Sequence, residues 1–293
     1  MDGRLILAQI VAGVATGALY FLVASGLTLI WGALGVVNLA HGSFFMLAAF
    51  AATTLVHQLG PGLGLLCALV VVPLLVLVFA VALETTLFRR VYVGGIWGQL
   101  LLSFGLLLVV NDLVRSGFGA VPRSIVAPDF LQGFVEVFGV RLAKYQLAIL
   151  ATTGLVALYL WHLLARSRTG RLIRAAVDDP AMLGAVGVDV KRLRTQVMGI
   201  AAVLAGIAGV IAAPRGAVNT TIDVQIVVIA FAVIVIGGLG SVWGALVAAL
   251  LVGIAEALST LVIDQGGEVV IFALMALVLF VMPTGFQTIA GRD

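Results

Sequence analysis

The chain has 293 residues; 63% of them are hydrophobic, 10% are charged and the formal net charge is +3. Soluble domains carry roughly 25% charged residues, so this composition, with a mean hydropathy of +1.26, excludes a soluble globular protein. The apolar stretches use up almost the whole length, which leaves no room for a soluble catalytic domain.

Apolar runs follow one another along the chain, and most are long enough to cross a hydrocarbon core of ~30 Å as helices. Backbone polar groups in lipid must be satisfied within the segment, which favours helices. The runs cover residues 5–30, 39–58, 63–87, 96–115, 145–165, 195–214, 224–240, 244–263 and 268–283. Their number is open, because 5–58 is long enough to contain a broken helix and GGLGS at 237–241 interrupts 224–263. We therefore predict an all-α polytopic membrane protein, a bundle of about eight to ten transmembrane helices in a single domain, residues 1–293.

Basic residues indicate how the bundle lies in the membrane. Seven of the 16 Lys and Arg residues fall between 166 and 194. Because cytoplasmic loops are enriched in Lys and Arg, we expect 166–194 to be a cytoplasmic loop. Counting one span back then makes 116–144 an external loop, where Pro122 and Pro128 predict irregular structure.

The cytoplasmic loop contains the short charged stretch VDDPAMLGAVGVD, residues 177–189. Asp179 and Pro180 are typical of the N-cap and first position of a helix, and Gly187 is typical of a left-handed helix stop. The helix between them has one apolar face, formed by Met182, Leu183 and Val186. A helix of about seven residues is marginal alone in water and needs a surface. That surface is either the membrane or this bundle, as for an ordinary capped loop, or a groove on a cytoplasmic partner, as for a coupling helix.

Three stretches resemble one known family of membrane proteins. TGRLIRAAVDDPAMLGAVGVDVKRLR (169–194) resembles the cytoplasmic loop of the permeases of branched-chain amino acid ABC importers. GALYFLVASGLTLIWGALGVVNLAHGSFFMLAAF (17–50) resembles the first block of the same family, and its N-x-AHG pattern is carried here by Asn38, Ala40, His41 and Gly42. GGLGSVWGALVAALLVGIAEALS (237–259), followed by VMPTG (281–285), resembles the C-terminal block. The external loop and 215–225 match poorly.

The resemblance implies a multi-pass protein of the bacterial inner membrane that imports branched-chain amino acids or related small solutes by alternating access. It also implies four kinds of partner: a second homologous permease, two cytoplasmic ATPase subunits, an external substrate-binding protein and the lipid bilayer. The ATPase would act on the coupling residues, which are Asp178, Asp179, Pro180, Met182, Leu183, Val186 and Gly187.

The chain carries no ATP-binding motif of its own. No G-x-x-x-x-G-K-[ST] sequence is present, so no phosphate-cradling loop is expected. We expect no cofactor on this chain, with ATP and Mg bound by partner ATPase subunits. The one cysteine, Cys67, lies in an apolar run, and neither a metal site nor a nucleic-acid site is expected.

Polar residues inside the apolar runs are candidate functional residues, because they are costly in lipid. Asn38, His41 and Ser43 cluster between the first two runs. They either line a passage at a helix break or form hydrogen bonds between helices. Glu256 lies in the middle of a run and is either an interhelical hydrogen-bonding group or a proton-coupling group.

A second polar group lies near the predicted outer surface. Asn219 and Thr221 belong to the polar stretch that follows Arg215. They form part of an outer mouth, contact a binding protein, or belong to a solvated loop. The candidate passage residues are thus Asn38, His41, Ser43, Asn219, Thr221 and Glu256.

Two rival functions remain from the residues alone. A stand-alone ion-coupled secondary transporter would use Glu256 and His41 as coupling groups near the midplane. An integral-membrane enzyme would need a cluster of catalytic polar groups near one interface, and no Ser/His/Asp set or carboxylate pair indicates one.

Overall fold

A computed structural model describes residues 3–92, 95–137, 140–178, 180–185, 187–262, 267–283 and 285–288. Within these residues, seven helices are long and apolar enough to cross a membrane, and two shorter apolar helices cover 222–237 and 267–281. Together they account for the nine apolar runs of the sequence. The predicted α-helical bundle is confirmed.

The elements follow the chain in a simple order. The helices are α1 (Gly3–Leu34), α2 (His41–Leu59), α3 (Pro61–Leu83), a π-helical turn η1 (Glu84–Phe88), α4 (Arg89–Val91), α5 (Gly95–Phe118), η3 (Asp129–Leu131), α6 (Lys144–Arg166), α7 (Arg168–Asp178), α8 (Pro180–Ala185), α9 (Val190–Ala212), η4 (Ala213–Arg215), α10 (Ile222–Gly237), α11 (Val242–Ser259), α12 (Gly267–Val281) and η5 (Gly285–Thr288). Two strands, β1 (Phe134–Val137) and β2 (Val140–Ala143), lie between η3 and α6.

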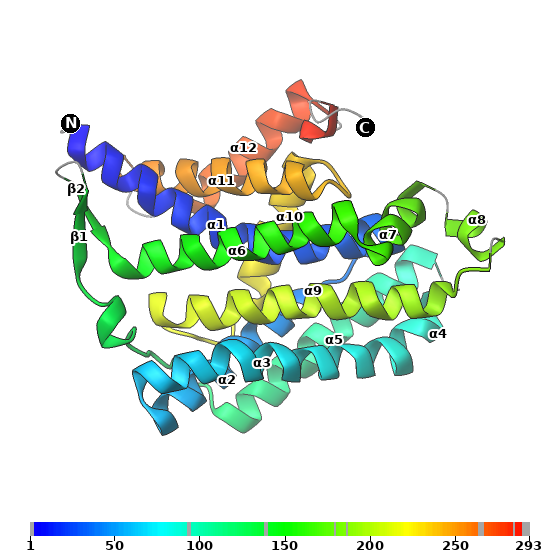
Figure 1. Cartoon of the computed structure of the whole chain (residues 1–293), viewed down its shortest axis with the longest axis horizontal. Helices are drawn as coiled ribbons and strands as arrows, with labels where there is room; N and C mark the ends of the chain where they lie inside the picture. The colour runs from blue at the N-terminus through cyan, green and yellow to red at the C-terminus, as the bar shows by residue number, and fades with distance from the viewer. Residues whose placement is uncertain are drawn as a thin grey trace.

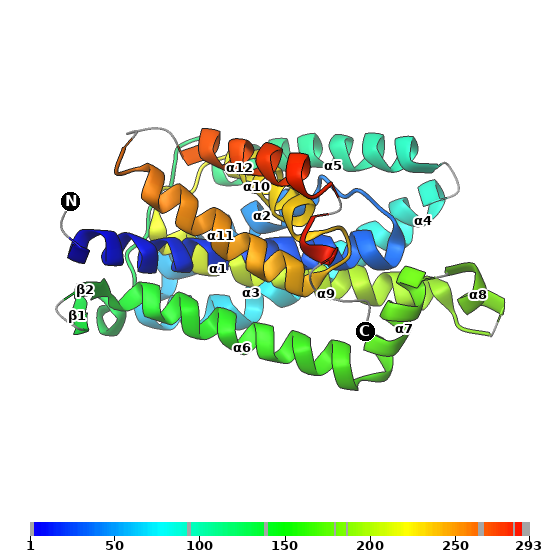
Figure 2. The same ribbon diagram turned by 90° about the horizontal axis from the view of Figure 1, so that it is seen from above.

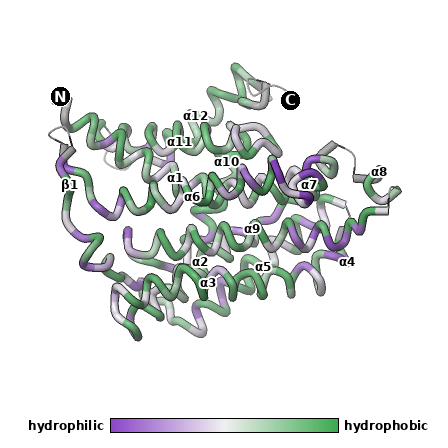
Figure 3. Tube along the Cα trace, viewed as in Figure 1, coloured by the Kyte–Doolittle hydropathy of each residue, from purple (hydrophilic) through white to green (hydrophobic). Residues whose placement is uncertain are grey.

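The long helices lie side by side along the longest axis of the molecule (Figure 1). The N terminus and the strands β1 and β2 are at one end, and α7 and α8 are at the other, in both views (Figures 1 and 2). Figure 3 shows mostly hydrophobic residues along the helices, with hydrophilic residues gathered on α7. Because α7 belongs to the Arg-rich loop, we call its end of the bundle the inner end and the opposite end the outer end.

The centre of the bundle is formed by α1, α2 and α9. The apolar window of α9 is 72% buried, whereas that of α6 is only 17% buried. Four phenylalanine side chains are fully enclosed: Phe21, Phe44, Phe50 and Phe88. In a membrane the exposed apolar faces of α5 and α6 are in contact with lipid or another apolar partner, so apolar side chains on these faces are not exposed to water.

The long first apolar stretch is indeed broken, as its length suggests. α1 ends at Leu34, residues 35–40 are not helical, and α2 begins at His41. Gly35 begins the break in the left-handed region at φ +63°, where glycine is favoured. From the inner end of α1 the chain turns back through this segment, so α2 starts inside the bundle (Figure 1).

Glycines let α1 and α11 pass very close to each other. A Cβ atom built on Gly253 would lie 2.3 Å from the backbone nitrogen of Gly17, and one built on Gly17 would lie 2.4 Å from the carbonyl oxygen of Ala249. Such contacts between backbones are typical of membrane helices with small residues at the interface. They place Tyr20 on α1 opposite Glu256 on α11.

The external loop differs in part from the all-α expectation. It contains a two-stranded antiparallel sheet, with Glu136 paired to Arg141 and Val135 paired to Leu142. Alternation of apolar and charged residues in both strands explains this hairpin, because alternate side chains point to opposite faces. The part before the hairpin is irregular, as the prolines predict, and Arg123 anchors it through two backbone hydrogen bonds with Val218 of 2.9 and 2.8 Å.

Candidate coupling and passage sites

The helix α8 ends as the sequence predicts. Gly187 has φ +82°, its N–H donates to the carbonyl of Gly184 at 3.2 Å, and the N–H of Val188 donates to the carbonyl of Leu183 at 3.1 Å. This pair of bonds is a Schellman stop. Of the other predicted coupling residues, Asp179 and Val186 lie outside the described residues, and only the backbone of Asp178 and Pro180 is described.

The apolar face predicted for α8 is divided between two environments. Leu183 is 6% exposed and belongs to the bundle's own apolar core, whereas Met182 is 64% exposed. Consecutive residues of a helix point about 100° apart, so one can face the bundle and the other the cytoplasmic side. Leu183 therefore holds α8 to its own chain, and Met182 presents an apolar surface outward.

An additional helix, α7, precedes α8 and was not expected in the loop. Ile173 and Ala176 are buried, with 3% and 4% exposure, while Arg171 and Arg174 are exposed. The bend between α6 and α7 depends on Gly170, because a Cβ there would lie 2.2 Å from the carbonyl oxygen of Leu163. The loop 166–194 is thus a folded arm packed on the bundle.

A short run of contacts joins α8 to the core. Asp189, two residues after the stop at Gly187, caps α9 by accepting hydrogen bonds from the backbone of Lys191 (3.0 Å) and Arg192 (3.1 Å). One helical turn further, the hydroxyl of Thr195 donates a 2.7 Å bond to the carboxylate of Glu84. These contacts connect the end of the loop to the first turns of α9.

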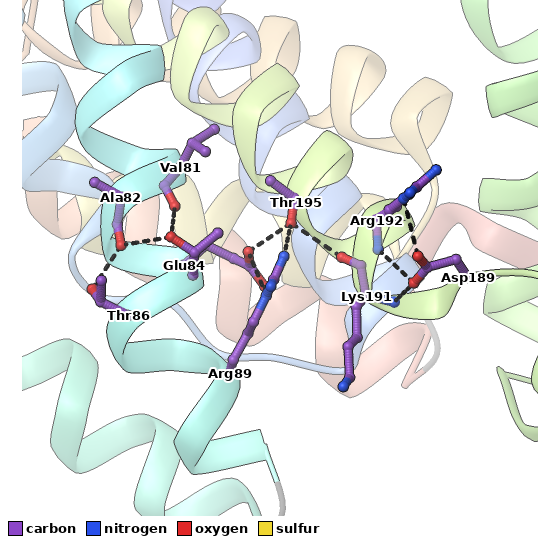
Figure 4. Close-up of polar contacts among 10 residues, drawn as sticks. Val81, Ala82, Glu84, Thr86, Arg89, Asp189, Lys191, Arg192 and Thr195 are labelled. Carbon is purple, nitrogen blue, oxygen red and sulfur yellow. Dashed lines mark hydrogen bonds and ion pairs between the residues drawn. The ribbon is translucent and has the colours of Figure 1, made fainter.

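The Glu84 carboxylate is the centre of a three-residue polar cluster at the inner end (Figure 4). Its side chain is fully buried, and Arg89 pairs with it at 3.3 Å. The guanidinium of Arg89 also donates to the Thr195 hydroxyl at 2.8 Å. We call Glu84, Arg89 and Thr195 the inner polar cluster; it links η1 and α4 to α9.

Tyr92 lies next to this cluster. The Arg194 guanidinium stacks over its ring, 4.4 Å from the centroid. Burial, and then the nearby Glu84 carboxylate, raise the pKa of the Tyr92 hydroxyl well above its ordinary value. The phenol is neutral at physiological pH, so the ring acts as a cation–π partner that ties the start of α9 to the end of α4.

The three candidate passage residues at the helix break are all buried. Asn38, His41 and Ser43 have no exposed surface. Nε2 of His41 lies 3.0 Å from the carbonyl oxygen of Val23 on α1, and the amide of Asn38 donates to the sulfur of Met198 on α9 at 3.6 Å. These contacts fit the interhelical interpretation.

The same three residues also keep unpaired polar atoms. Within the described part of the chain, Oδ1 of Asn38, Nδ1 of His41 and Oγ of Ser43 are buried without a hydrogen-bond partner. Burying a polar atom without a hydrogen bond costs free energy of folding. These atoms therefore also fit a passage that is closed in this conformation. Their role as passage residues stays a prediction.

The polar outer stretch is only partly a solvated loop. Asn219 accepts hydrogen bonds from the backbone and hydroxyl of Thr221, at 3.0 and 2.9 Å, and so shapes the turn before α10. Asp223, two residues later, is fully buried and accepts a 3.0 Å bond from Asn111 on α5. No sequence pattern indicated this pair, because 112 residues separate its members.

Glu256 has a partner on another helix. Its carboxylate accepts a 2.7 Å hydrogen bond from the hydroxyl of Tyr20 on α1. The interhelical hydrogen bond expected for a mid-span carboxyl is therefore present. Tyr20 itself was not singled out from the sequence, since only the close antiparallel packing of α1 and α11 brings the two residues together.

One hollow of the molecule has Thr195 of the inner polar cluster at its edge. It is a groove of about 680 Å³ between α3, α6 and α9, lined mainly by leucine, isoleucine and valine side chains such as Leu77, Leu155 and Ile200. An apolar groove on the outside of a membrane bundle suits acyl chains or an apolar helix. It offers little to a charged solute.

Comparison with known proteins agrees with this architecture. The chain matches the family described as branched-chain amino acid transport system, permease component, over residues 9–281. It is 32% identical over 298 residues to the high-affinity branched-chain amino acid transport system permease protein BraD of Pseudomonas aeruginosa, covering 98% of this chain and 96% of that protein. It is also 32% identical over 299 residues to the permease protein LivH of Escherichia coli K12, with the same coverage. No solved structure matches the chain.

The fold and these matches define the class: a multi-pass membrane permease, which is a transport component and not itself an enzyme. More particularly, the chain belongs to the family of permease components of branched-chain amino acid transport systems. The resemblance drawn from its sequence blocks is confirmed.

Proposed function

We propose that this chain is the membrane-spanning subunit of an ATP-driven ABC importer that moves branched-chain amino acids or related small solutes inward across the bacterial inner membrane. The observation that carries the proposal is the identity of 32% over 98% of the chain to permeases named for high-affinity branched-chain amino acid transport. The described part of the chain, a bundle of apolar helices, supports a role in passage rather than in catalysis.

The proposed assembly contains this permease domain, residues 1–293, a second homologous permease, two cytoplasmic ATPase subunits and an external substrate-binding protein. ATP and Mg are bound by the ATPase subunits, and this chain binds no cofactor. The missing phosphate-loop motif supports that division, since a permease without it depends on another subunit for ATP hydrolysis.

The proposed coupling device is α8. Its exposed Met182 is the contact for an ATPase groove, and Leu183, the stop at Gly187 and the capping carboxylate of Asp189 carry its displacement to α9. The inner polar cluster then carries the displacement to α3 and α4. Alternating access follows when these helices move relative to α1 and α2, between or on which the candidate passage residues Asn38, His41 and Ser43 lie.

The test is co-purification from detergent-solubilised membranes of the native host. We compare wild type with Met182→Glu, which places a charge on the proposed contact, and with Val121→Glu, which places the same charge on a residue that is 77% exposed at the outer end. An ATPase should co-purify with wild type and Val121→Glu and be lost from Met182→Glu. Retention of the ATPase by Met182→Glu would contradict the coupling role of α8, and absence of any ATPase from the wild-type complex would favour an ion-coupled secondary transporter.

A further inference from the structure

A cavity of about 260 Å³ lies toward the outer end, between α1, α2, α9 and α10. We call it the outer cavity. Its polar lining comes from Tyr20, Arg215 and Gln225, and its apolar walls include Phe45, Ile226 and Ile229. The volume is near the lower limit of ~300 Å³ for small-molecule pockets, which suits a solute the size of one amino acid.

Two ionisable groups are linked to this cavity: Arg215 lines it, and Glu256 is bonded to its lining residue Tyr20. The guanidinium of Arg215 donates a 2.8 Å hydrogen bond to the hydroxyl of Thr16, and the carboxylate of Glu256 accepts one of 2.7 Å from Tyr20. Among the described residues, neither charge takes part in an ion pair. Each is held by a neutral hydroxyl instead.

The two hydroxyls belong to one face of α1. Thr16 and Tyr20 are four residues apart, so they lie one above the other on the same side of the helix. They therefore hold Arg215 and Glu256 against the same face of α1. A third charge, Glu268, lines a neighbouring hollow of about 210 Å³ that shares Gln225 and Ile229 with the outer cavity, and it adds to the negative side.

Glu256 lies within the apolar helix α11, where an ionisable group is costly and is a functional hypothesis by default. Arg215 is exposed at the outer end of the bundle. A cation and a carboxyl that do not pair with each other, together with the apolar walls of the cavity, complement a zwitterion that carries an aliphatic side chain.

We propose that the outer cavity binds a zwitterionic aliphatic amino acid during its passage, with Arg215 receiving the carboxylate, the Tyr20–Glu256 pair receiving the ammonium group, and Phe45, Ile226 and Ile229 enclosing the side chain. The inference rests on the proposed function for its cargo class. It goes beyond it by assigning the binding site to groups inside one permease chain.

The experiment measures protection of a cysteine placed in the cavity. Ala217 lines it, so Ala217→Cys in a Cys67→Ser background is labelled with a maleimide in the complete complex, in the presence and absence of leucine. 4-Methylpentanoate, which lacks the ammonium group, and 3-methylbutylamine, which lacks the carboxylate, are the matched probes. Leucine should slow the labelling of the cysteine. To give the same protection as leucine, each analogue should need a concentration about tenfold higher or more, because it lacks one charge-assisted contact.

Substitutions then assign each contact. Arg215→Gln should raise the leucine concentration needed for protection about tenfold and leave that of 3-methylbutylamine unchanged. Glu256→Gln should also raise the leucine concentration needed for protection about tenfold, and it should leave the concentration of 4-methylpentanoate needed for protection unchanged. Arg141→Gln removes an exposed arginine from the hairpin at the same end and should change nothing.

The outcomes separate this inference from the proposed function. Protection by leucine that is lost in Arg215→Gln and in Glu256→Gln supports the site, whether or not uptake needs ATP. If the same complex imports leucine with ATP while leucine gives no protection, or all three probes protect equally, the site is overturned and the importer stands.

Discussion

Thr195 on α9 and Glu84 at the start of η1 are joined by a 2.7 Å hydrogen bond across 111 residues of sequence. Glu84 is fully buried, and a buried carboxylate is stable only with partners that satisfy its charge. The bond therefore fixes the first turns of α9 against the bundle. In the coupling mechanism that we propose, a movement of α8, which precedes α9 in the chain, reaches the core through this contact.

Removing the Thr195 hydroxyl should weaken the inner end. Thr195→Val keeps the shape but deletes a hydrogen bond to a charged group, which costs about 1.5–3 kcal/mol. The thermal unfolding midpoint of the purified complex should fall clearly. Thr85→Val is the control, since the Thr85 hydroxyl is exposed and bonds only to carbonyls of its own helix. Equal midpoints for the two variants would show that the contact does not hold α9.

Loss of the cation should cost more than loss of the hydroxyl. Arg89→Met leaves the Glu84 carboxylate buried without its charged partner, which costs about 3–5 kcal/mol. The neighbouring variant Arg90→Met, at an exposed residue, should have little effect. Neutralising the carboxylate as well, in Arg89→Met/Glu84→Gln, should recover part of the stability. If the double variant is no more stable than Arg89→Met, the ion pair is not the cause of the loss.

A side chain added at the glycines where α1 and α11 cross should destabilise the protein. Gly253→Ala forces a methyl group against the backbone of Gly17, and overpacking of this kind costs about 1–3 kcal/mol. At Gly154 on α6 a Cβ meets open space, so Gly154→Ala should be neutral or stabilise by up to about 1 kcal/mol. Unfolding midpoints of the two variants check this, and a tolerant Gly253→Ala would mean that the helices do not pass as closely as described.

The buried polar atoms at the helix break should become accessible during transport. Ser43 is fully buried and its hydroxyl has no hydrogen-bond partner among the residues that the structure describes, so Ser43→Cys should be tolerated. In a Cys67→Ser background it should resist a water-soluble maleimide at rest and react when the ATPase is trapped with ATP and vanadate. A cysteine that stays unreactive in every state would assign Asn38, His41 and Ser43 to interhelical bonding alone.

Most of the fold follows from the sequence, because lipid imposes a strong rule. Each apolar run must be a helix, so the bundle could be predicted, and the orientation that the basic loop indicates stays a prediction. The stop at Gly187 was equally predictable, since a glycine at that position favours the left-handed conformation found there. The helix α7 and the β1–β2 hairpin were missed, because both are short and stabilised by packing on the bundle rather than by apolar length.

The contacts between distant helices could not be predicted. Tyr20 with Glu256 and Asn111 with Asp223 are pairs separated by more than 100 residues, and hydropathy carries no information about which helix faces which. Division of the α8 face between Leu183 and Met182 was missed for a related reason. Helical spacing shows which apolar residues lie near one another on a helix, but the surface that each of them contacts depends on how the loop folds back on the bundle.

The most direct test of the importer is uptake of radioactive leucine by proteoliposomes containing the complete purified complex, with its binding protein supplied outside. Uptake should require ATP inside the vesicles, should persist without any ion gradient, and should be lost with Met182→Glu but not with Val121→Glu. Leucine uptake driven by a proton or sodium gradient in the absence of ATP would contradict the account and identify the chain as a secondary transporter.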